Sequence, residues 1–143
     1  MPLDPERALS AALLARLRAD PGVAAIVAAR VHDQPPPETP HPWLHLGRVE
    51  TRVAGGAPAE GVELMVTLTA VSTFGGKEEA LALNAAVREA LHDAELAPGD
   101  HRLVLLHVLF QDVFRAADWR AVYGVSRVRA VLEPIAALLA EAA

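Results

Sequence analysis

Residues 61–93 constrain the fold most, because they describe one strand that turns directly into one amphipathic helix. From Val62 to Phe74 apolar and polar side chains alternate, which is the pattern of a strand buried on one face. Gly75-Gly76 then gives the backbone the freedom to reverse. The apolar residues that follow recur at three- and four-residue steps, as on one stripe of a helix: Ala80, Leu83, Val87, Ala90, Leu91 and Ala94. A strand and a helix joined this closely predict a layer of helix packed on sheet.

The remaining segments extend this unit into a domain of two hairpins and further helices. In order, the patterns predict a helix at 4–19, a short helical segment at 23–29, a brief extended piece at 30–33, a proline-rich connector at 34–42, strands at 43–53 and 62–74 joined by a Gly-rich loop, a helix at 78–94, strands at 101–114 and 120–132, and a C-terminal helix or tail at 134–143. We therefore expect one α+β domain over residues 1–143. Its two layers would be a mainly antiparallel sheet of about four strands and helices packed on one face.

The strand at 101–114 is apolar on both of its faces. A hairpin register that pairs Phe114 with Arg120 and Leu106 with Val128 would give the two strands one shared face. Helices in a two-layer domain cover only one side of a sheet, so the second side needs other cover. The C-terminal helix and a neighbouring subunit are both open at this point. The candidate subunit interface consists of Leu103, Leu105, Leu109, Arg127 and Arg129.

Composition excludes several classes of protein. The chain has 143 residues, a formal net charge of −5 and a pI near 5.6, whereas a dedicated nucleic-acid binder normally carries a basic patch. It contains no cysteine, which removes disulfides, thiolate metal sites and cysteine nucleophiles. No apolar run reaches the length of a membrane-spanning helix, and the first residues lack the features of a secretory signal. We expect no membrane contact, and a cytoplasmic site of synthesis and assembly.

The sequence offers no recognisable catalytic or metal-binding pattern. His41 and His45 have the spacing of a metal-ligand pair, but Pro42 between them prevents the helix that such a pair needs. Asp112 and Asp118 flank a loop without an accompanying nucleophile or base, and no serine lies in a Gly-x-Ser-x-Gly turn. We therefore predict a protein that is not an enzyme and that has no cofactor and no metal.

Four segments together resemble a known protein family over nearly the whole chain. They are A-L-L-A-R-L-R-A-D-P-G-V-A-A-I-V-A-A-R-V-H-D at Ala12–Asp33, P-W-L-H-L-G at Pro42–Gly47, L-T-A-V-S-T-F-G-G-K-E-E-A at Leu68–Ala80 and Y-G-V-S-R-V-R-A-V-L-E at Tyr123–Glu133. This pattern is similar to the small phage tail-completion, or tail terminator, proteins, which also occur in prophages and gene transfer agents. The motifs are patterns of fold and carry no active-site residues.

The resemblance implies a structural virion-type protein that forms a ring, commonly a hexamer, on the end of the tail tube. Such a ring ends tail growth and offers a surface for head–tail joining, so the implied partners are copies of the chain, the tube protein and head or neck adaptors, with DNA only in transit. The implied location is the tail of a phage or gene transfer agent particle. Candidate contact loops for the tube or neck contain Gly55, Gly56, Glu60, Arg115, Asp118 and Trp119. The alternatives are a neck or head-completion protein and, in a different class, a small cytoplasmic ligand-binding domain or enzyme.

Overall fold

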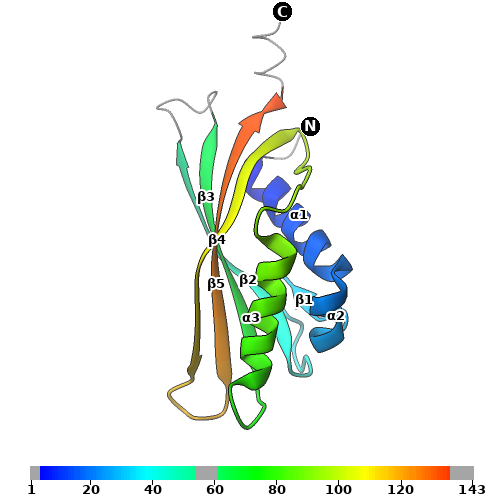
Figure 1. Cartoon of the computed structure of the whole chain (residues 1–143), viewed down its shortest axis with the longest axis vertical. Helices are drawn as coiled ribbons and strands as arrows, with labels where there is room; N and C mark the ends of the chain where they lie inside the picture. The colour runs from blue at the N-terminus through cyan, green and yellow to red at the C-terminus, as the bar shows by residue number, and fades with distance from the viewer. Residues whose placement is uncertain (1–3, 54–60, 136–143) are drawn as a thin grey trace, which may run out of the picture.

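A mixed sheet forms one layer of the protein and helices form the other (Figure 1). The structure is a computed structural model that describes residues 4–53 and 61–135, and within these it has three helices and five strands. In chain order they are α1 Pro5–Ala19, α2 Pro21–Val27, β1 Val31–His32, β2 Trp43–Val53, β3 Val62–Ser72, α3 Glu78–Leu91, β4 His101–Arg115 and β5 Val122–Pro134. The α+β class and the two-layer arrangement are thus confirmed, with one strand more than the expected four.

The strands lie in the order β1-β2-β3-β5-β4. β1 runs parallel to β2, and every other neighbouring pair is antiparallel. β5 therefore lies between β3 and β4, and the second hairpin joins the first through its last strand. The proline-rich connector lets the chain return so that β2 runs parallel to β1. At the end of the connector, Arg30 Nε donates a hydrogen bond to the carbonyl oxygen of Pro42 at 2.8 Å.

The two N-terminal helices share a capping residue. The Asp4 carboxylate accepts a hydrogen bond from the backbone N–H of Arg7 at 2.7 Å and begins α1. Asp20 ends α1, and its carboxylate accepts from the N–H of Val23 at 3.0 Å to begin α2. This shared cap directs α2 back toward α3, and the apolar stripe of α1 (Leu9, Leu13 and Leu17) is fully buried against the sheet side of the domain.

The core lies between the helices and the side of the sheet that they cover. Along β5 the even-numbered residues from Val122 to Leu132 are buried, and the residues between them turn to the opposite side. α3 contacts β3, β4 and β5. It comes close to the sheet at Gly124, where the buried Asn84 side chain fills the space that a Cβ atom would take.

The register of the β4–β5 hairpin differs from the predicted one. Phe114 lies opposite Tyr123 and not opposite Arg120 as predicted, and Leu106 lies opposite Ala130 and not opposite Val128 as predicted. The turn is longer than expected, and two β-bulges interrupt β4 at 103–105 and 108–110. Because each bulge adds one residue to β4, it reverses which side chains face the helices.

Two predicted features lie outside the described residues: the C-terminal helix or tail beyond Ile135, and the central part of the Gly-rich loop, 54–60. Among the residues that the structure does describe, no helix is long and apolar enough to cross a membrane.

Candidate subunit interface

The side of the sheet that faces away from the helices is uncovered within residues 4–53 and 61–135, and it is a candidate surface for assembly. In Figure 1 all three helices lie on one side of the sheet. The opposite side, here called the open face, carries the odd-numbered residues of β5 from Tyr123 to Glu133, and Met65, Thr67 and Thr69 of β3 beside them. Most of these side chains are half-buried by their neighbours, so the open face mixes apolar, hydroxyl and charged groups.

The structure divides the five predicted interface residues between different surroundings. Leu105 lies opposite Val131 and belongs to the open face, as do Arg127 and Arg129. Leu103 does not belong to it: it lies opposite Leu132 and packs against the core on the helix side. Leu109 is the extra residue of the second bulge, has no partner on β5 and is 54% exposed. The bulges explain both departures, since side chains alternate faces only along an uninterrupted strand.

Both arginines of the open face form ion pairs inside the chain. Arg129 Nη2 lies 3.1 Å from Glu63 Oε2, and both side chains are about two-thirds buried or more. Arg127 Nη2 lies 3.7 Å from Glu50 Oε1, and both are about half exposed. Arg129 thus pairs with the neighbouring strand β3 and Arg127 reaches past β3 to β2, so the charge of each arginine is balanced before any neighbouring subunit arrives.

Of the candidate contact loops, the structure describes the turn between β4 and β5. Arg115 donates from Nη2 to the carbonyl oxygen of Gly75 at 3.1 Å, and its guanidinium lies 5.4 Å from the centroid of the Trp119 ring. Asp118 accepts from the backbone N–H of Arg120 at 3.0 Å, which closes the turn. Trp119 is 76% exposed. The other three predicted contact residues, Gly55, Gly56 and Glu60, lie outside the described residues.

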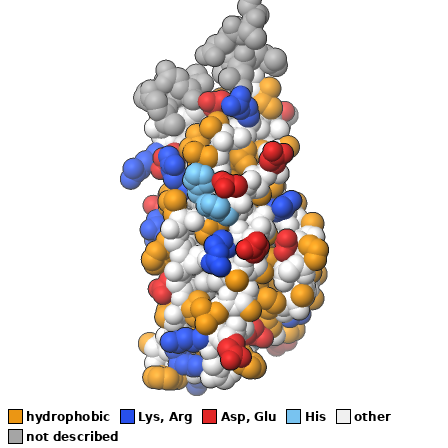
Figure 2. Space-filling view, viewed as in Figure 1, with side chains coloured by type: hydrophobic (Ala, Val, Ile, Leu, Met, Phe, Trp, Pro, Cys, Tyr) orange, Lys and Arg blue, Asp and Glu red, His pale blue; other side chains and the backbone are white. Residues whose placement is uncertain are grey.

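At the middle of the outer edge of β4 the backbone groups of Leu106 and Val108 are already hydrogen-bonded, which no local sequence pattern predicts. The backbone N–H of Asp93 donates to the carbonyl oxygen of Leu106 at 2.9 Å, and the N–H of Val108 donates to His92 Nδ1 at 3.0 Å. His107 lies beside them, with its Nε2 3.2 Å from Asp93 Oδ1. Figure 2 shows histidine side chains gathered on this side of the molecule among acidic and basic ones. Because these edge groups are already paired, a neighbouring strand cannot add to β4 there.

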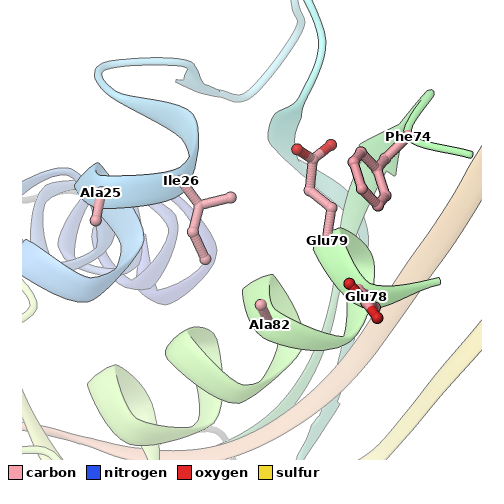
Figure 3. Close-up of a pocket in the computed structure, with 6 residues that line it drawn as sticks. All are labelled: Ala25, Ile26, Phe74, Glu78, Glu79 and Ala82. Carbon is pink, nitrogen blue, oxygen red and sulfur yellow. The ribbon is translucent and has the colours of Figure 1, made fainter. Parts of the chain in front are cut away.

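A shallow groove between α2 and α3 was also missed (Figure 3). Its sides come from segments far apart in the sequence, so no local pattern could indicate it. The residues that line it are Ala25, Ile26, Phe74, Glu78, Glu79 and Ala82. In the part of the chain that the structure describes, no group of three or more His, Asp or Glu side chains could hold a metal ion.

Comparisons with known proteins agree with one another. The family model for Tail completion protein gp17 matches residues 11–133. A chain in the solved structure of the virion of a native gene transfer agent (GTA) particle superposes with a TM-score of 0.81 at 30% sequence identity, over 87% of this chain and 94% of that one. No curated protein sequence gives a significant match.

Proposed function

We propose, since the chain belongs to the Tail completion protein gp17 family, that it forms a ring, commonly a hexamer, that caps the tail tube. The ring would end tail growth and offer the surface at which head and tail join. The family membership and the likeness to a chain of a gene transfer agent virion identify a structural protein of a phage-type tail. The proposed partners are the tube protein on one side and head or neck adaptors on the other, and the proposal includes no catalytic step.

One structural observation carries the ring proposal: the sheet is covered by described helices on one side only. The open face exposes parts of Leu105, Val125 and Val131 together with the ion pairs of Arg127 and Arg129. A monomer generally avoids a large contiguous apolar surface unless it binds something. Identical subunits that join through two different surfaces, head to tail, close into a ring when the rotation allows it.

The ion pairs suit a contact between subunits. A charge that enters an interface without a partner costs several kcal/mol, as an order of magnitude, so pairing it beforehand lowers that cost. Arg129 is already paired with the partly buried Glu63, and a neighbour can cover that pair without leaving either charge alone. The aliphatic residues beside the pair would then supply the favourable burial.

The test is a comparison of two neighbouring leucines that the bulge places on opposite sides of the sheet. Leu105→Glu on the open face is expected to leave a folded monomer and to weaken assembly by about 2 kcal/mol or more if the site is central. Leu103→Glu on the core side is expected to lower Tm, because it introduces an unpaired charge against the core. Leu81→Glu, on an exposed part of α3, makes the same chemical change away from the open face.

Assembly is measured by native mass spectrometry and sedimentation over a concentration series, with and without purified tail tubes. Wild type that stays monomeric even on tubes would refute the ring. Rings that form equally well in wild type and Leu105→Glu would remove the open face from the contact. Rings that bind heads and ignore tubes would support a neck or head-completion protein.

A further inference from the structure

We infer that Trp119 of one subunit inserts into the groove between α2 and α3 of the next subunit and joins the ring at one end of the sheet. The inference rests on the proposed ring and names a contact within it. The donor is the β4–β5 turn, residues 115–120, and the acceptor is the groove of Figure 3. The occupant is thus a second copy of this chain.

The groove has a firm apolar wall with an acidic rim. Ile26 of α2 and Ala82 of α3 face each other across it, and Phe74 closes one end with its side chain 52% exposed (Figure 3). The backbone of Phe74 is held in place: its N–H donates to Ser72 Oγ at 3.1 Å, and that hydroxyl donates to Glu79 Oε1 at 2.7 Å. These hydrogen bonds fix the backbone of Phe74 and the Glu79 carboxylate before anything binds, which lowers the entropy cost of binding at that end of the groove.

Trp119 has the exposure and conformation of a residue kept for contact. It is the most exposed of the large hydrophobic residues that the structure describes. Its φ of 64° lies in the left-handed region, which is unfavourable for a bulky side chain and which glycine or asparagine would occupy at lower cost. Strain of this kind at an exposed position points to a function outside the fold of the monomer. Large aromatic residues are also frequent anchors at the centres of interfaces.

The two surfaces have complementary charge. Arg115 and Arg120 flank the tryptophan, and the side chain of Arg120 has no ion pair to the described residues. On the groove, the carboxylate of Glu78 is exposed and Glu79 is half-buried. Asp118 on the donor turn is already bonded to a backbone N–H. Lys77, next to the groove, is exposed but does not line it. With Asp118 and Lys77 counted, the donor turn carries a net charge of +1 and the groove together with Lys77 a net charge of −1, so the two surfaces are opposite in charge.

The positions of donor and acceptor fit a closed ring. Figure 1 shows the β4–β5 turn and the turn between β3 and α3 together at one end of the molecule, with α2 in the same half but farther from that end. The Arg115–Gly75 hydrogen bond ties the first two together. The donor turn and α2 nevertheless lie on opposite sides of the molecule in that view. A head-to-tail contact in a cyclic ring requires two different surfaces of the subunit, and the donor turn and the groove are two such surfaces.

The first experiment separates assembly from folding. Trp119→Gly removes the side chain and relieves the strained backbone, so Tm is expected to be unchanged or raised. The concentration at half-assembly is expected to rise at least about tenfold. A ring that assembles as well with glycine as with tryptophan would overturn the inference. So would a variant whose rings form normally but no longer bind purified tail tubes, since the turn would then contact the tube.

The second experiment is an exchange of charge. Glu78→Arg and Arg120→Glu are each expected to weaken assembly, and the double variant is expected to recover most of it, because the exchanged charges again oppose one another. Glu89→Arg makes the same change of charge on an exposed part of α3 outside the groove and serves as the control. Single variants that assemble like Glu89→Arg, or a double variant without recovery, would refute the pairing. If wild type forms no ring with or without tubes, the proposed function fails together with this inference; if it forms rings that ignore all these variants, only the inference fails.

Discussion

Gly124→Ala tests how closely α3 approaches the sheet. A Cβ atom at position 124 would lie 2.6 Å from Asn84 Oδ1 and 3.3 Å from the Cβ atom of Ala70. Both neighbours are buried, and Asn84 is held by a hydrogen bond from its Nδ2 to the carbonyl oxygen of Asp112 at 3.2 Å. The added methyl group therefore has no open space and must displace a side chain that is itself fixed.

Two opposing effects set the magnitude. Overpacking of a filled core costs about 1–3 kcal/mol. Replacement of glycine by alanine also restricts the unfolded chain, which returns about 0.4–1 kcal/mol. We expect a net loss of about 1–2 kcal/mol in the free energy of unfolding, which corresponds to a fall in Tm of about 3–8 °C for a domain of this size.

The source of the loss is identified by a second substitution. Asn84→Ala removes the close neighbour together with one hydrogen bond, and is expected to cost about 1 kcal/mol by itself. Its Oδ1 has no hydrogen-bond partner among the described residues, so little else is lost. In the Asn84→Ala background, Gly124→Ala should cost less than half as much, because only the contact with Ala70 remains. The expected coupling energy is about 1 kcal/mol.

The assay is urea unfolding of all four proteins, followed by circular dichroism at concentrations where sedimentation shows monomers. Monomers are needed because assembly would stabilise every variant by mass action. A Gly124→Ala protein as stable as wild type would show that α3 lies farther from β5 than described. Equal costs in both backgrounds would show that Asn84 is not the obstacle.

Two further outcomes are expected. Gly61→Ala should lose about 1–3 kcal/mol in the free energy of unfolding, because φ is 124° there and the new Cβ atom would lie 2.8 Å from the carbonyl oxygen of Leu132. Gly75→Ala is the matched control, because a Cβ atom there would meet nothing within 4 Å. Equal losses of the two variants in urea unfolding would contradict this account. The backbone N–H of Arg7 lowers the pKa of Asp4 below 3.8, so Asp4 stabilises the fold above about pH 4, and that contribution falls as the pH drops through the lowered pKa. Unfolding measured from pH 5 to 2.5 should therefore show a weaker acid dependence in Asp4→Asn, and identical pH profiles would refute the effect.

The sequence alone predicted most of the secondary structure, because its signals are local. Alternation placed the strand at 43–53 with the bounds that the structure has, and helical periodicity together with an acidic first turn placed the start of α3 at Glu78. The period-two pattern extended the next strand to Phe74, although it ends at Ser72, whose hydroxyl accepts from the N–H of Phe74. The α+β class follows from these elements, since an apolar stripe and an apolar strand face bury each other.

Tertiary structure decided which side chains share a surface. Residues 101–115 read as one strand apolar on both faces, and nothing in the local pattern shows that Val104 and Leu109 are extra residues with no partner on β5. Each bulge depends on how β4 pairs with β5, which the pattern of β4 alone does not determine, and each one exchanges the faces of every residue beyond it. Leu103 therefore packs in the core while Leu105 reaches the open face. The groove and the closed edge of β4 depend on distant segments in the same way, because only the folded chain brings α2, α3 and the ends of the strands together.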